Sequence, residues 1–135
     1  MIVVDASVVA NALADDSADG ELARRRLTEA SVLAAPDLVD VETVSVLRRR
    51  WLAGDLTARR FSAAVDDLAT LKLTRLPTLP LMRRAYELRA NVTPYDATYV
   101  AVAEHLSWRL VTADARLARA PGIRCTVEII GSGAK

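Results

Sequence analysis

Short apolar runs alternate with longer helix-like segments along this chain, and this alternation restricts the fold more than any other feature. Strands are predicted at residues 2–4, 31–35, 73–76, 109–112 and 125–130. Helices are predicted at residues 6–14, 20–30, 38–52, 57–71, 79–90, 94–106 and 114–119. Strands separated by helices favour an α/β fold, with a central, mostly parallel β-sheet that is flanked by α-helices on both faces.

Two helix starts carry recognisable capping residues. Asp37 follows a predicted strand and is expected to cap the helix that runs to Leu52, because its carboxylate can accept hydrogen bonds from the first amides of the helix. Thr93 stands before Pro94 and three residues before Asp96, which is the pattern of a capping box.

The length and composition predict one domain. The chain has 135 residues, of which 52% are hydrophobic, so a sizeable core is available. No linker or repeat is visible, and we expect a single domain at residues 1–130 and a flexible tail at 131–135. Cys125 is the only cysteine, which excludes an intramolecular disulfide and agrees with a reducing cytoplasm. No run of about 18 apolar residues is present, so no membrane span is expected.

Four acidic residues stand at the ends of apolar segments, and they are the candidate functional residues. Asp5 and Asp114 each follow a predicted strand. The carboxyl ends of parallel strands meet at one edge of the sheet, where open α/β sheets bind their ligands. Asp96 lies in the first turn of a helix and Glu42 lies near the start of another, so both can face the same edge.

Each acid also has an ordinary structural explanation. Asp5 and Asp114 are suitable N-caps for the helices that follow them, and Asp96 fits the capping box described above. Glu42 can be a surface residue of its helix. Each of these explanations suffices for one acid. They explain less well why four such acids should stand at positions that can share one edge of the sheet.

Several carboxylates in one place repel each other, and at least one is then expected to have a raised pKa. A hard divalent cation such as Mg²⁺, which prefers oxygen ligands, is the natural occupant of such a site. Ser7, Asn11 and Thr112 are expected to orient the metal ligands or waters by hydrogen bonds, without contacting the metal themselves. The five glycines are scattered, which disfavours a glycine-rich phosphate loop.

Two other classes of α/β protein have acidic Mg²⁺ sites. A phosphoacceptor receiver domain requires paired acids after the first strand and a lysine after the last, but Ala6 follows Asp5, and the lysines are Lys72 and Lys135. A haloacid-dehalogenase phosphatase requires a second aspartate where Ser7 stands. Both readings are disfavoured.

Four segments of the chain resemble PIN-domain proteins, and most of all the VapC toxins of bacterial VapBC toxin–antitoxin systems. They are MIVVDAS at residues 1–7, Glu42 in its helix, TPYDATYVAVA at residues 93–103 and LVTAD at residues 110–114. Their order and spacing match along nearly the whole chain, from Ile2 to about Ile130. Each segment is weak evidence alone, but the combination is fairly specific.

The resemblance implies an endoribonuclease that depends on Mg²⁺, with Mn²⁺ as a substitute. It implies that Asp5, Glu42, Asp96 and Asp114 are catalytic and that Asp5, Asp96 and Asp114 hold the metal. It also implies a homodimer that cleaves RNA and is neutralised by a VapB-type antitoxin. The alternative is a catalytically degenerate PIN domain that binds RNA or a protein partner without cutting.

The chain departs from the family pattern at Arg116. Many relatives carry an acid or an asparagine two residues after the last aspartate, where this chain has arginine. One metal ion is therefore expected, and a second is left open. Arg116 can instead contact a phosphate of the substrate.

Overall fold

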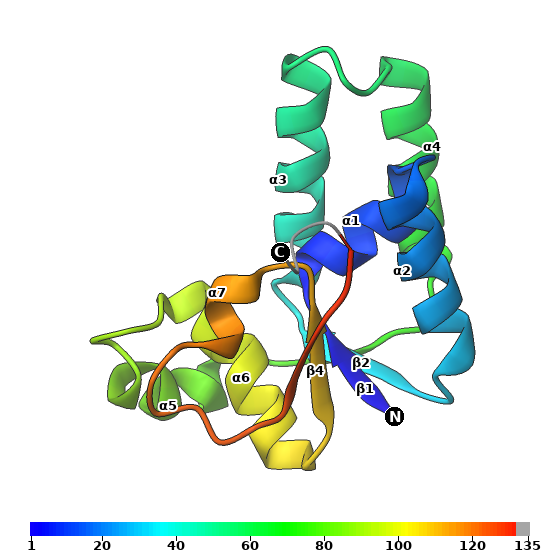
Figure 1. Cartoon of the computed structure of the whole chain (residues 1–135). Helices are drawn as coiled ribbons and strands as arrows, with labels where there is room; N and C mark the ends of the chain where they lie inside the picture. The colour runs from blue at the N-terminus through cyan, green and yellow to red at the C-terminus, as the bar shows by residue number, and fades with distance from the viewer. Residues whose placement is uncertain (132–135) are drawn as a thin grey trace.

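A parallel β-sheet forms the centre of the molecule (Figure 1). The computed structural model describes residues 1–131. In this range the sheet has five strands, in the order β3-β2-β1-β4-β5. Their bounds are β1 Ile2–Val4, β2 Leu33–Pro36, β3 Thr74–Leu76, β4 Arg109–Thr112 and β5 Val127–Ile129. Every neighbouring pair is parallel, so the predicted α/β fold is confirmed.

Helices follow each of the first four strands. Their bounds are α1 Ala6–Ala14, α2 Ala18–Glu29, α3 Val39–Leu52, α4 Ala58–Thr70, the 3-10 helix η1 Leu79–Leu81, α5 Met82–Glu87, α6 Pro94–Leu106 and α7 Ala115–Ala118. Helix α6 contacts β1, β2 and β4, and its residues 97–103 are buried. None of the described helices has the length and apolar character needed to cross a membrane.

The strand order places a crevice beside β1. The chain adds β2 and β3 on one side of β1, and then returns to add β4 and β5 on the other side. The order therefore reverses between β1 and β4. In open α/β sheets, such a reversal separates the connections on either side and leaves a crevice at the carboxyl ends of the strands.

Helices α3 and α4 form a hairpin that projects from the body of the molecule (Figure 1). A small apolar cluster joins this hairpin to α1, with Ala10, Leu47, Leu56 and Ala64 buried in it. Gly54 ends the turn after α3 with φ of +82°, a left-handed conformation that glycine adopts without strain. The hairpin and the sheet body together border the crevice.

Three local predictions were wrong. Asp37 does not cap α3: the N-cap is Leu38, and the Asp37 amide instead donates to the Leu76 carbonyl at 2.7 Å. The single helix expected at 79–90 is a 3-10 turn followed by the short α5. The last strand begins at Val127 rather than at residue 125. Of the tail expected at 131–135, residues 132–135 lie outside the described part of the chain.

Candidate active site

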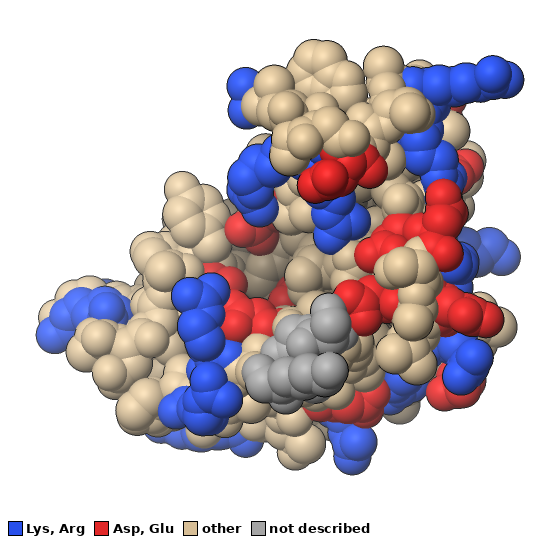
Figure 2. Space-filling view, turned by 45° about the horizontal axis from the view of Figure 1, so that its top comes forward, with Lys and Arg blue, Asp and Glu red and all other residues tan. Residues whose placement is uncertain are grey.

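A pocket of about 180 Å³ opens at the carboxyl ends of β1 and β4. All four predicted acids line it, together with Ser7, Arg49 and Tyr99. Figure 2 shows acidic side chains within the hollow of this face and basic side chains around it. The fold thus brings the acids to one place, and their catalytic roles remain predictions.

Asp5 lies at the bottom of this site, between β1 and α1. Its Oδ1 accepts the Ser7 hydroxyl at 2.5 Å and the Val8 amide at 3.2 Å. Its Oδ2 accepts the Thr112 hydroxyl from the end of β4. Burial raises the pKa of Asp5 and outweighs these hydrogen bonds, which act in the opposite direction.

Glu42 reaches the pocket from the first turn of α3. The Tyr99 hydroxyl of α6 donates to Glu42 Oε1 at 2.6 Å. Burial raises the pKa of Glu42, and the nearby charges of Asp96 and Asp5 raise it further. Tyr99 is 1% exposed, so its ring belongs to the core while its hydroxyl holds a pocket residue.

Asp96 and Asp114 have opposite electrostatic surroundings. Burial, and secondarily the charge of Asp114, raises the pKa of Asp96. The pKa of Asp114 is lowered, chiefly because Arg116 donates from Nε and Nη2 at 3.1 and 3.0 Å. Arg116 therefore neutralises one acid of the pocket, and its own side chain is largely exposed to solvent.

Two of the acids that line the pocket also cap helices, as their sequence positions predict. Asp5 caps α1 through Val8, and Asp114 caps α7 through Arg116. Thr93 Oγ1 accepts the Asp96 amide at 3.2 Å, which confirms this part of the predicted capping box. A helix that starts where a strand ends puts its N-cap at the functional edge of the sheet, so one carboxylate can serve both purposes.

The supporting residues were predicted in part. Ser7 and Thr112 contact Asp5 as expected. Asn11 does not contact the acids: its Oδ1 accepts Arg50 Nη2 at 2.6 Å, and it lines a neighbouring pocket. Asn11 lies one turn beyond Ser7 on α1, which carries it away from the strand ends and under the hairpin.

Sequence reasoning missed Tyr99. The residue stands in a helix that is otherwise rich in alanine and valine, three positions after Asp96 and therefore on the same helix face. That spacing was a usable signal. Its partner on α3 could not be identified without the tertiary structure.

The donor chemistry of the pocket fits a hard divalent cation. Its candidate ligands are carboxylate oxygens, and three of the four acids have a raised pKa, as expected where negative charges are buried close together. Among residues 1–131, however, no group of three acidic, histidine or cysteine side chains is close enough to form a ready-made metal site. Tyr99 donates to one oxygen of Glu42, and Arg116 donates to both oxygens of Asp114, so two of the acids already have hydrogen-bond partners.

The family follows from a comparison with family models. The model of the PIN domain matches residues 2–123, which is most of the chain. The chain belongs to the PIN-domain family.

Curated relatives narrow this to the VapC group of that family. Ribonuclease VapC1 of Mycobacterium tuberculosis is 42% identical over 129 residues, covering 95% of this chain and 96% of that protein. Ribonuclease VapC9 of the same organism is 41% identical over 130 residues, covering 96% and 98%. The predicted resemblance to VapC proteins is therefore confirmed.

Solved structures show the same fold. Mycobacterium tuberculosis VapC20, a toxin that cleaves the sarcin-ricin loop, aligns with a TM-score of 0.71 and 21% identity, over 92% of this chain and 97% of that chain. DNA-bound VapBC from Salmonella typhimurium aligns with a TM-score of 0.65 and 18% identity, over 93% and 96%. At these identities the likeness concerns the fold alone.

Proposed function

We propose that this chain is a metal-dependent endoribonuclease that hydrolyses RNA phosphodiester bonds as the toxin of a toxin–antitoxin pair. The observation that carries the proposal is the pocket itself, where carboxylates from four separate segments meet at the switch point of the sheet. Membership of the VapC group supports the reaction class, because the curated relatives are ribonucleases.

Asp5, Asp96 and Asp114 are the residues that would hold Mg²⁺ or Mn²⁺. When bound, such an ion activates water and neutralises charge on the phosphoryl group. Ser7 and Thr112 fix both oxygens of Asp5, so this carboxylate is oriented before any ligand arrives. Arg116 would leave Asp114 for a phosphate of the substrate, which frees both Asp114 oxygens for the metal.

Glu42 is the proposed general base. Tyr99 occupies its Oε1, so Oε2 is the oxygen that would accept a proton from the attacking water. A raised pKa brings a carboxylate closer to neutral pH, which suits a base that must take up a proton in the reaction. The neighbouring Asp96 and Asp5 would favour the protonated product of that step.

Asp5 can be tested by substitution. Asp5→Asn should reduce RNA cleavage by at least about a hundredfold, because it removes a charge that the metal and the developing phosphoryl charge both require. Cleavage of labelled RNA is measured with Mg²⁺, with Mn²⁺ and with EDTA. Asp37→Asn is the matched control, since Asp37 also follows a strand but lies outside the pocket. Full activity of Asp5→Asn, or undiminished activity in EDTA, contradicts the proposal.

A VapB-type antitoxin is the proposed partner, and a homodimer is the proposed assembly. The support is the acidic pocket, which suits a basic side chain of a partner segment, and the fold shared with the toxin subunits of solved VapBC complexes. Co-expression with the product of the neighbouring small gene, followed by purification and light scattering, tests both. A stable complex that blocks cleavage is expected, whereas a monomer that binds no such product contradicts this part.

A further inference from the structure

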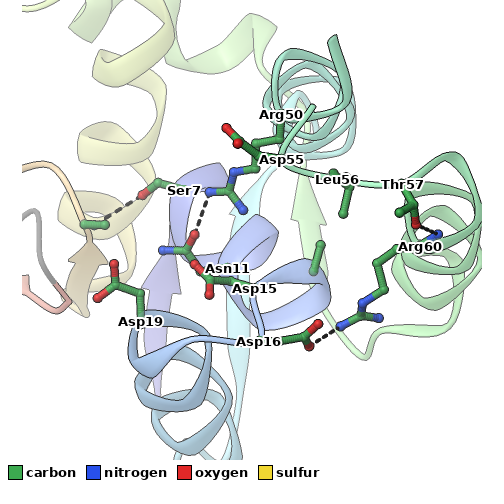
Figure 3. Close-up of a pocket in the computed structure, with 12 residues that line it drawn as sticks. Ser7, Asn11, Asp15, Asp16, Asp19, Arg50, Asp55, Leu56, Thr57 and Arg60 are labelled. Carbon is green, nitrogen blue, oxygen red and sulfur yellow. Dashed lines mark hydrogen bonds and ion pairs between the residues drawn. The ribbon is translucent and has the colours of Figure 1, made fainter. Parts of the chain in front are cut away.

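A second and larger pocket lies beside the acidic pocket, beneath the α3–α4 hairpin (Figure 3). Its volume is about 750 Å³, which is ample for one nucleotide. Its walls come from α1, from the start of α2 and from both helices of the hairpin with the loop between them. None of the four acids with a proposed catalytic role lines this pocket.

The two pockets share a wall. Ser7 lines both of them, because its hydroxyl donates to Asp5 on one side and accepts the Ala113 amide at 3.2 Å on the other. Ala113 lines the larger pocket, and its neighbour Asp114 lines the acidic one. A polymer whose phosphate enters the acidic pocket therefore has the larger pocket as the adjoining space for its next unit.

Asn11 is a polar lining residue whose side chain is held in a fixed orientation. The residue is 9% exposed, and Arg50 from α3 fixes its orientation by donating to Oδ1 at 2.6 Å (Figure 3). Within residues 1–131 the side-chain amide nitrogen of Asn11, Nδ2, makes no hydrogen bond, and it is not a fully buried atom. An oriented donor is thus open to the pocket from a nearly buried side chain.

The charged residues that line the larger pocket disfavour binding of another RNA phosphate there. The pocket carries four carboxylates and two arginines, namely Asp15, Asp16, Asp19, Asp55, Arg50 and Arg60. Arg60 is already paired with Asp16 at 3.0 Å, and Arg50 is already bound to Asn11. A neutral group with hydrogen-bond donors and acceptors suits this lining better than an anion does. An unpaired nucleobase has that chemistry along its edge.

We propose that this pocket binds the base of the unpaired nucleotide next to the scissile phosphate, and that Asn11 and Asp55 thereby set the base preference of cleavage. The inference rests on the proposed ribonuclease function. Asn11 supplies a donor for a base acceptor, and Asp55, an exposed residue of the hairpin loop that also lines the pocket, supplies an acceptor. A basic peptide is the competing occupant, since the lining carries four carboxylates and two arginines, and a loss of antitoxin affinity with unchanged base preference would identify it.

The test digests a randomised pool of single-stranded RNA with the full chain and Mg²⁺, and then sequences the cut ends. Wild-type protein should prefer particular bases at a position next to the cut. Asn11→Ala and Asp55→Asn should each weaken that preference about fivefold, which is the scale of one hydrogen bond. Asp66→Asn is the matched control, since Asp66 is an exposed acid of α4 outside the pocket, and it should keep the wild-type preference.

The outcomes separate the two proposals. Asn11 is nearly buried, so its variant is checked by thermal melting, whereas Asp55 is exposed and its variant should fold as the wild type does. Cleavage that retains its base preference in both variants, or that shows none in the wild type, overturns the base pocket alone. So does a loss of antitoxin affinity with unchanged preference. Equal cleavage by wild type and Asp5→Asn overturns the ribonuclease proposal, and the base pocket with it.

Discussion

Single residues in this protein combine structural and site roles. Asp5 and Asp114 cap helices and line the acidic pocket at the same time. Tyr99 is a core residue whose hydroxyl reaches Glu42. Such residues tie the geometry of the pocket to the packing of the fold, because the side chain that positions a carboxylate is itself held by the core.

Tyr99 is predicted to act through Glu42. Tyr99→Phe removes the donor to Glu42 Oε1 and leaves the ring in place, so kcat should fall roughly tenfold, as for the loss of a hydrogen bond to a charged group. KM for RNA should change little, because the Tyr99 hydroxyl is already bound to Glu42 and the residue is only 1% exposed, so it offers the substrate little contact of its own. Tyr95→Phe is the control: Tyr95 is one turn earlier on α6 and 64% exposed.

A double-mutant cycle distinguishes positioning from a general loss of structure. If Tyr99 works by orienting Glu42, then Tyr99→Phe should have little further effect on kcat in a Glu42→Gln background. A full, multiplicative loss in that background would show that the hydroxyl does not act through Glu42.

At the scale of elements, α1 and the start of α2 approach each other closely at Gly20. A side-chain carbon at Gly20 would stand 1.7 Å from the Asp15 carbonyl oxygen, which is a backbone atom at the end of α1. The close approach of the two helices thus requires glycine. It also shapes one wall of the larger pocket, since Asp15 and Asp19 are lining residues there.

Gly20→Ala should therefore destabilise the protein, by about 1–3 kcal/mol, because the backbone of one helix must move. The free energy of unfolding is measured by urea denaturation. Glu21→Ala, at the exposed neighbouring position of α2, is the control. An unhindered glycine-to-alanine change inside a helix stabilises by up to about 1 kcal/mol, so a stabilised Gly20→Ala protein would refute the close contact.

At the scale of the whole molecule, three of the four pocket acids destabilise the metal-free fold near neutral pH. A carboxyl group whose pKa is raised by folding binds its proton more tightly in the folded state. Its favourable contribution is present at pH below its ordinary pKa and is lost as pH rises through the raised value. Asp5, Glu42 and Asp96 act in this direction, while the lowered pKa of Asp114 acts in the opposite one.

This cost predicts how Mg²⁺ and pH affect thermal stability. In EDTA, Asp96→Asn should melt a few degrees above the wild type near pH ~7.5, and the difference should shrink as pH falls toward about 4, the ordinary pKa of an aspartate, because the wild-type carboxyl takes up its proton as pH falls. Millimolar Mg²⁺ should raise the melting temperature of the wild type, because the ion binds the folded state, and should raise that of Asp96→Asn less.

Calorimetric or fluorescence melting curves at several pH values measure both effects. Asp37→Asn is the control and should follow the wild type, since Asp37 lies outside the pocket. A pH-independent difference between wild type and Asp96→Asn, or no effect of Mg²⁺ on either, would count against cation binding in this pocket.

The sequence predicted most elements closely. The bounds of α1 and β4 agree with the expected residues, and α6 starts and ends where Thr93 and the late His105–Leu106 stretch indicated. The errors arose where tertiary contacts outweigh local preference. Asp37 is a good N-cap by type, but its amide is bound to the end of β3, so α3 starts one residue later than a capping Asp37 would place it.

The sequence by itself determined the α/β class, the family resemblance and the set of acids, because hydrophobic periodicity and strand-end position are local properties. The tertiary structure decided which side chains meet. The strand order brings β1 beside β4, which places Asp5 next to Thr112, and the packing of α3 against the body brings Glu42 to Tyr99. It also places Asn11 away from the four acids, in the lining of the pocket under the hairpin. Contacts across such separations depend on the direction of whole elements, which no short stretch of sequence encodes.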